Sequence, residues 1–268
     1  MLKDITLGQY FPGNSIAHRL DPRTKILLVT LYIIALFSAK GWMGYAVMAV
    51  TLAACVKVSH VGLRALVRGL KPLVFIIAFT GILNMFFTPD THYLWEWGIL
   101  RVSVKGIENA LFMVIRIMLL VMGTFLMTYT TSPIRLTDGL ESLLNPLKKI
   151  HVPVHELAMM MAIALRFIPT LIEETDKIRS AQKARGADFD SGSIFQKAKA
   201  LVPILVPLFI SAFRRADELA TAMECRCYHG GEGRTKLHVL KYQRRDYVAL
   251  TGGTVILALV VVLRRLGT

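Results

Sequence analysis

The chain has 268 residues, of which 54% are hydrophobic, and its mean hydropathy is +0.52. This composition argues against a soluble domain and indicates a polytopic membrane protein. The formal net charge is +14, but the basic side chains do not alternate with aromatic ones as on a nucleic-acid platform, so we expect no nucleic-acid partner. Cys55, Cys225 and Cys227 do not form a disulfide framework. The N-terminus lacks the apolar core of a cleavable signal, so we expect none.

The first two apolar runs follow a polar N-terminal segment. Asp21-Pro22 predicts a helix start, because the carboxylate can cap free amides and Pro needs no hydrogen bond there. The runs Ile26–Ala39 and Trp42–Val56 are each shorter than the roughly 20 residues of a straight span. We therefore predict two short helices joined by a tight turn at residues 39–41.

A basic loop, Lys57–Lys71, precedes the third apolar run, which Pro72 opens and which extends over Leu73–Phe87. The loop at residues 88–103 carries tryptophans, as a membrane interface often does. The fourth run, Gly106–Tyr129, is long enough to cross a bilayer.

The fourth run contains Glu108 near one end and Arg116 near its middle. A mid-membrane arginine costs about 2.5–3.5 kcal/mol on insertion scales, so Arg116 should face protein rather than lipid. One interpretation is contact with a partner or a substrate path. The other is a salt bridge or carbonyl contact inside the helix bundle.

Residues 131–245 form a long, mostly polar block. Apolar residues at three- and four-residue steps predict two long amphipathic helices, the first bent near Pro169. The run Leu201–Phe213 is too short to cross and contains Pro203 and Pro207, so we expect that helix to lie against the membrane surface or its sister helix. A last span is predicted at Tyr247–Leu263.

The charge distribution predicts the orientation. Residues 131–245 hold 18 Lys/Arg and 12 Asp/Glu (18 − 12 = +6), and residues 57–71 hold four Lys/Arg and no acid. Because basic loops face the cytoplasm, both segments and the N-terminus should lie inside, and residues 89–105 outside. The predicted fold is all-α, with about five transmembrane helices and a cytoplasmic or interfacial helical domain. Its segments are 1–130, 131–245 and 246–268.

Two segments of the polar block end alike. Residues 176–186 and 217–227 align with an offset of 226 − 185 = 41, which places Arg185 on Arg226. Arginine is favourable at a helix C-terminus, and Gly186 is a good terminator, so both could be ordinary helix ends. The alternative is that each arginine enters a groove on one of two similar soluble subunits and pairs with carboxylates there.

Catalytic and metal-binding patterns are weak. The chain has no G-x-x-x-x-G-K-[ST] loop, so we do not expect it to hydrolyse ATP, and no nucleophile–base pair suggests itself. His151 with His155, or the Cys225-x-Cys227-x-His229 sequence, could bind a metal, but neither has a second ligand pair. We expect no metal site. A channel or secondary transporter would need ionisable residues along a path across the membrane, and only Glu108 and Arg116 could line one. An intramembrane enzyme would need catalytic residues at the same depth in the membrane, and the sequence has none.

Five motifs are spread over nearly the whole chain: Gly8–Ser15, His18–Lys25, Arg166–Glu174, Ala181–Gly186 and Arg215–Ala220. Together they resemble the EcfT family, the transmembrane coupling subunits of energy-coupling factor (ECF) transporters.

The resemblance implies a non-catalytic subunit of a vitamin or micronutrient importer in a prokaryotic cell membrane. The segment 131–245 would hold coupling helices that dock into two ABC-type, EcfA-like ATPases, which bind ATP and Mg²⁺, while this chain binds no cofactor. A membrane S component would bind the substrate. The docking role carries to Ala184-Arg185-Gly186 and Cys225-Arg226-Cys227, although the second motif lacks the family's usual Ala and Gly flanks.

The apolar faces of the coupling helices are candidates for contact with the S component. Methionines adapt their shape and would suit several such partners, but a Met-rich core is the equal alternative. The candidate contact residues are Leu157, Met160, Met161, Leu205 and Leu208.

Overall fold

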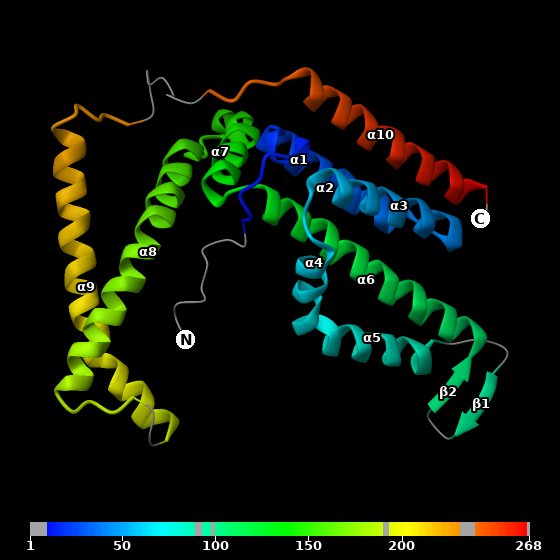
Figure 1. Cartoon of the computed structure of the whole chain (residues 1–268), viewed down its shortest axis with the longest axis horizontal. Helices are drawn as coiled ribbons and strands as arrows, with labels where there is room; N and C mark the ends of the chain where they lie inside the picture. The colour runs from blue at the N-terminus through cyan, green and yellow to red at the C-terminus, as the bar shows by residue number, and fades with distance from the viewer. Residues whose placement is uncertain (1–9, 89–92, 98–99, 190–192, 231–238, 267–268) are drawn as a thin grey trace. The chain divides into compact units, whose positions relative to one another are not determined.

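The structure is a computed structural model of the chain, and it describes residues 10–88, 93–97, 100–189, 193–230 and 239–266. The described chain is helical apart from one antiparallel hairpin, β1 (Tyr93–Trp97) with β2 (Leu100–Ser103), so the all-α prediction is confirmed (Figure 1). It forms two compact units, one from residues 8–140 and 240–268 and the other from residues 141–239. The helices are α1 (Ile16–Arg19), α2 (Pro22–Ser38), α3 (Gly41–Ser59), α4 (Leu63–Leu70), α5 (Val74–Phe87), α6 (Val104–Thr130), α7 (Pro133–Leu144), α8 (Val154–Ala184), α9 (Ile194–Glu224) and α10 (Arg244–Arg265).

The predicted turn between the first two apolar runs is confirmed. α2 ends at Ser38, and α3 begins at Gly41, whose φ of +67° is a left-handed conformation that glycine adopts without steric cost. The two helices pack with α6 and α10 in the larger unit (Figure 1). Its core includes Leu36, Met48 and Val260, each at most 1% exposed.

A buried polar network joins the starts of α2 and α10. Asp246 is 1% exposed, and its carboxylate accepts the backbone N–H of Asp21 at 2.8 Å and that of Gln243 at 2.7 Å. At the same end, Lys25 Nζ donates to the carbonyl oxygen of Thr130 at 2.8 Å. Because buried polar groups need partners, these contacts hold the ends of α2, α6 and α10 at one level.

The segment that we predicted as a basic loop, Lys57–Lys71, is partly helical. α4 begins at Leu63, and its leucines at a four-residue step, Leu66 and Leu70, are buried, whereas Arg64 and Arg68 are exposed. This is the pattern of an amphipathic helix. A 3₁₀ turn at Lys71–Leu73 then leads into α5. The β1–β2 hairpin likewise replaces part of the loop predicted at residues 88–103.

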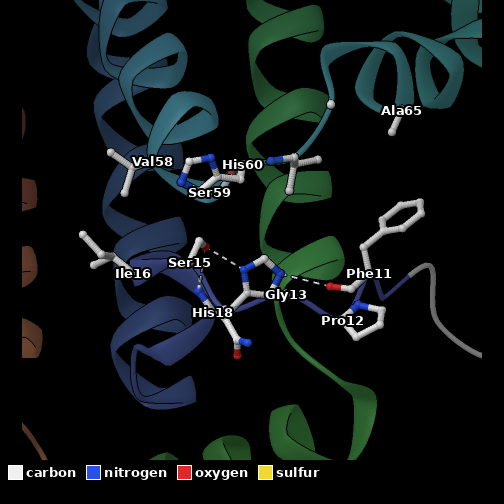
Figure 2. A pocket seen from close by; sticks show the side chains of 13 residues that line it. Phe11, Pro12, Gly13, Ser15, Ile16, His18, Val58, Ser59, His60 and Ala65 are labelled. Atoms are coloured by element: carbon white, nitrogen blue, oxygen red, sulfur yellow. Dashed lines mark hydrogen bonds between the residues drawn. The ribbon is translucent and has the colours of Figure 1, made fainter.

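An open hollow of about 770 Å³ lies between the N-terminal segment and the start of α4 (Figure 2). His18 is buried beside it, with Nδ1 2.6 Å from Ser15 Oγ and Nε2 3.0 Å from the carbonyl oxygen of Phe11. The Phe11 N–H in turn donates to the carbonyl of Tyr129 at 3.0 Å. Both imidazole nitrogens are therefore engaged, and the histidine ties the N-terminal segment to α6.

The smaller unit is built on α8 and α9, which cross each other as antiparallel helices (Figure 1). The second long helix of this segment is present as predicted, and α9 continues through Pro203 and Pro207. Proline lacks an N–H, so Pro207 leaves the carbonyl of Pro203 without its helical donor. The side chain of Gln182 on α8 donates to that carbonyl at 3.4 Å. The neighbouring helix thus supplies the missing hydrogen bond.

The number of helices that could cross a membrane differs slightly from the predicted number of about five. Six helices of the described chain are long and apolar enough to cross a membrane: 41–59, 63–87, 104–130, 154–184, 195–224 and 244–265. α2, which we expected to cross, is absent from this group and has only 17 residues. α8 and α9, which we assigned to the cytoplasmic or interfacial domain, meet this test of length and composition because each continues for 31 residues, and long amphipathic coupling helices meet it as well.

Candidate docking surfaces

The first arginine motif forms the C-terminal cap of α8. Gly186 has a φ of +86°, its N–H donates to the carbonyl of Lys183 at 3.0 Å, and the N–H of Ala187 donates to Gln182 at 3.0 Å. This pair of bonds is a Schellman motif, which satisfies the last free carbonyls of a helix. Arg185 occupies the cap position, and its side chain is exposed.

The second motif repeats this geometry without a glycine. Cys227 has a φ of +56° and donates its N–H to the carbonyl of Glu224 at 2.8 Å, and Tyr228 donates to Met223 at 3.1 Å. Every position of this cap lies 41 residues after its counterpart in the first. Arg226 therefore takes the same place as Arg185, and it is also exposed. The sequence repeat is a repeat of backbone structure.

Because α8 and α9 are antiparallel, the two caps lie at opposite ends of the pair. Gln182 contacts Pro203 near one end, and the Tyr228 hydroxyl lies 3.1 Å from Met159 Sδ near the other. α9 has 31 residues, which corresponds to about 46 Å of helix. Within the described residues neither Arg185 nor Arg226 forms an ion pair. Each is an available cation on a rigid helix end.

Substitutions at the two left-handed positions should have opposite effects on stability. Gly186→Ala should lower the free energy of unfolding by about 1 kcal/mol, because a Cβ is strained there, although nothing else lies within 4 Å. Cys227→Gly should raise it by about 0.5 kcal/mol, since relief of strain exceeds the entropic cost of glycine. Thermal unfolding of the full chain in detergent measures both changes.

Cys225→Gly is the matched control, because Cys225 has ordinary right-handed angles, φ −58° and ψ −22°. It should destabilise the chain by about 0.5–1 kcal/mol. If the two glycine substitutions shifted the melting temperature equally, the left-handed cap at Cys227 would be refuted.

A polar contact fixes the crossing of α8 and α9. Glu174 accepts hydrogen bonds from Ser211 Oγ and from Arg215 Nη2, the latter at 2.6 Å. Both carboxylate oxygens are thus engaged by α9 in a partly buried position, where charge-assisted bonds are strong. Glu174 and Arg215 belong to the resembling motifs, and their contact suggests that these motifs preserve the helix crossing.

The candidate apolar contact residues fall into two groups. Leu157, Met160 and Met161 are exposed on α8 toward the end where Tyr228 contacts that helix. Leu205 is exposed and Leu208 is half-buried, and both lie on α9 toward the Gln182 contact. The antiparallel crossing therefore separates residues that we had grouped together. We had not singled out Phe209 and Phe213, which are 62% and 70% exposed and one helical turn apart.

The structure does not pair Glu108 with Arg116, the two charged residues singled out in the fourth apolar run. Arg116 Nε and Nη2 donate to the hydroxyl of Tyr45 at 2.9 and 2.5 Å, and the guanidinium also lies 5.7 Å from the centre of the Phe37 ring. Glu108 is exposed about two helical turns away. Arg116 thus contacts a hydroxyl rather than a carboxylate.

The candidate metal ligands do not cluster. In the described ranges no group of three or more His, Cys, Asp or Glu side chains could hold a metal ion. His155 Nδ1 instead lies 3.0 Å from Glu141 Oε1, and Cys225 and Cys227 are exposed free thiols.

Comparison with known proteins assigns the family. Residues 13–237 match the CbiQ family, described as "Cobalt transport protein". Three curated relatives carry the name "Energy-coupling factor transporter transmembrane protein EcfT". The protein of Ruminiclostridium cellulolyticum is 54% identical over 96% of this chain and 95% of its own length. That of Acidaminococcus fermentans is 56% identical (98% and 97%), and that of Bacillus subtilis is 46% identical (98% and 100%). The chain therefore belongs to the EcfT family and is a multi-pass transmembrane component of an energy-coupling factor transporter.

Proposed function

We propose that this chain is the coupling subunit of its transporter, linking ATP hydrolysis by two ABC-type ATPase subunits to reorientation of a substrate-binding S component. The observation that carries the proposal is the pair of identical Schellman caps, each presenting an exposed arginine at one end of the crossed helices. Two matching caps, one at each end of the helix pair, suit two similar partners.

Each docking site would consist of the arginine and its small neighbours. Ala184 and Gly186 flank Arg185, and Cys225 and Cys227 flank Arg226, so the partner's groove can approach the backbone closely. A carboxylate in that groove would bind the guanidinium with charge-assisted, bidentate hydrogen bonds. Because the contact between Glu174 and Arg215 fixes the crossing, a motion of the two arginine caps would move the whole α8–α9 pair.

The exposed apolar residues of α8 and α9 would contact the S component. The group near Leu157 and the group near Leu205 lie on opposite halves of the pair, so rotation of the helices would move them in opposite senses. Such a surface favours sliding contacts over one rigid interface.

The location and chemistry follow from the same proposal. The excess of Lys/Arg in residues 131–245 supports a cytoplasmic location of the docking helices and of the N-terminus in a prokaryotic cell. ATP and Mg²⁺ would be bound by the ATPase subunits, and this chain would bind no cofactor and catalyse no reaction. The vitamin or other micronutrient would be chosen by the S component.

Reconstitution into lipid vesicles tests this function. The chain, its two ATPases and an S component should together take up the S component's ligand with ATP, and omission of either ATPase should abolish uptake. A non-hydrolysable ATP analogue is the control. Uptake by the chain without ATPases would overturn the proposal in favour of a channel or secondary transporter.

A further inference from the structure

We propose that the end of the larger unit where α2 meets α3 binds the headgroup of an anionic phospholipid, with Arg116 as its deepest contact. The starting observation is that Arg116 lacks an acid. A guanidinium has five N–H donors, and the two bonds to Tyr45 use only Nε and one N–H of Nη2. The other three have no acceptor among the residues that the structure describes.

Further cations lie at the same end of the bundle. Lys40 occupies the α2–α3 turn, and Arg264 and Arg265 end α10; all three are exposed. Their shared level follows from the packing of α2 with α10. The two helices begin together, where Asp246 bonds Asp21, and stay side by side, with Gly253 close to Leu28. Arg116 is brought to this level by its contact with Tyr45, in the second turn of α3.

The four cations outnumber the acids of the helices that carry them: α6 has Glu108 about two turns from Arg116, and Asp246 lies at the opposite end of α10 from Arg264 and Arg265. The sequence has no Asp or Glu from Pro22 to Pro89, from Asn109 to Thr137, or from Tyr247 to Thr268. Uncompensated charge in or near a bilayer is costly, so an anion from outside the chain is expected to meet it. Arginine is well suited to phosphate, which it binds with two parallel hydrogen bonds.

The surroundings favour a lipid over a protein carboxylate. Trp42 is 55% exposed, packs 4.9 Å from Phe112 (ring centres), and stands beside Lys40, a pairing typical of a membrane–water interface. Phe37 and Ile34 are 58% and 48% exposed on α2 below the turn, where they would contact an acyl chain. Long cationic side chains reach from such a surface to the phosphate level. Cations above an apolar surface match the two parts of a phospholipid.

Native mass spectrometry of the full chain in detergent tests the proposal with phosphatidylglycerol and phosphatidylcholine as probes. The unmodified chain should retain phosphatidylglycerol at least about tenfold better, and Arg116→Gln should remove most of that preference, because a hydrogen-bonded charge pair is lost. A triple variant, Lys40→Gln with Arg264→Gln and Arg265→Gln, should reduce it severalfold. Arg19→Gln, an exposed arginine of α1 in the same unit, should leave it unchanged.

Because Arg116→Gln could disturb packing around Tyr45, the triple variant at exposed positions decides the test if the single variant does not fold. Equal retention of both lipids by the unmodified chain would overturn the proposal. So would a preference that survives both variants. Capture of a protein subunit, rather than lipid, by a photo-crosslinker placed at position 37 in the assembled transporter would identify this end as a protein interface and also overturn it.

Discussion

Replacing both Arg185 and Arg226 by glutamate is expected to abolish co-purification of the ATPase subunits with the membrane chain. Each substitution reverses the charge at an exposed cap and would place a carboxylate against the carboxylates of the partner groove. Loss of one interface hot spot costs about 2 kcal/mol or more, and the two sites are too far apart to couple. The combined loss of at least about 4 kcal/mol corresponds to roughly a thousandfold weaker assembly.

The single variants sharpen this experiment. Arg185→Glu and Arg226→Glu should each release one ATPase while the other stays bound, because the caps lie at opposite ends of the helix pair. The matched control is Lys177→Glu with Arg214→Glu, two exposed cations of α8 and α9 that lie outside both caps. That control should keep both ATPases. Retention of both ATPases by the Arg185/Arg226 double variant would show that the caps are not docking sites.

Asp246→Ala is expected to destabilise the membrane unit by about 3–5 kcal/mol. The carboxylate is 1% exposed and is the acceptor for two backbone N–H groups, of Asp21 and Gln243. Removing it leaves both donors unpaired in a buried position, at about 1–3 kcal/mol each, and removes negative charge near the buried Lys25. Thermal unfolding of the full chain in detergent should show a large decrease in the melting temperature.

Asp217→Ala is the control for this prediction, because Asp217 is exposed on α9. Its effect should stay within about 0.5 kcal/mol, as for most surface substitutions. Asp246→Asn should give an intermediate loss, since an amide keeps only one acceptor oxygen. If Asp246→Ala melted within a degree or two of the unmodified chain, the network would have no role in joining α10 to α2.

Local chemistry explains where prediction from the sequence succeeded. The turn at residues 39–41 needs only Gly41 and a break in the apolar run, and the two caps need only residues within one helical turn of Arg185 and Arg226. These patterns depend on only a few neighbouring residues, so they can be recognised in the sequence before the fold is known. α4 could also have been predicted, because Leu66 and Leu70 have helical spacing. The four basic residues of Lys57–Lys71 led instead to the prediction of a loop.

The prolines of α9 show why other features could not be predicted. A proline inside a helix frees a carbonyl, and whether the helix continues depends on whether another donor arrives. Here the donor is Gln182, 21 residues before Pro203 and on another helix. α9 stays continuous over 31 residues and is one of the helices long and apolar enough to cross a membrane.

The sequence by itself determined that the chain is a helical membrane protein, where its two arginine caps lie, and which family it resembles. These depend on composition, short-range capping and motif spacing. Only the tertiary structure decided that the caps occupy opposite ends of a crossed pair, that Leu157 and Leu205 lie apart, and that Arg116 meets a hydroxyl instead of an acid. Each of these depends on contacts between residues far apart in the chain, as in the bond between Asp21 and Asp246, which are separated by 225 positions. Helix packing brings such residues together, and these long-range contacts cannot be predicted from local sequence patterns.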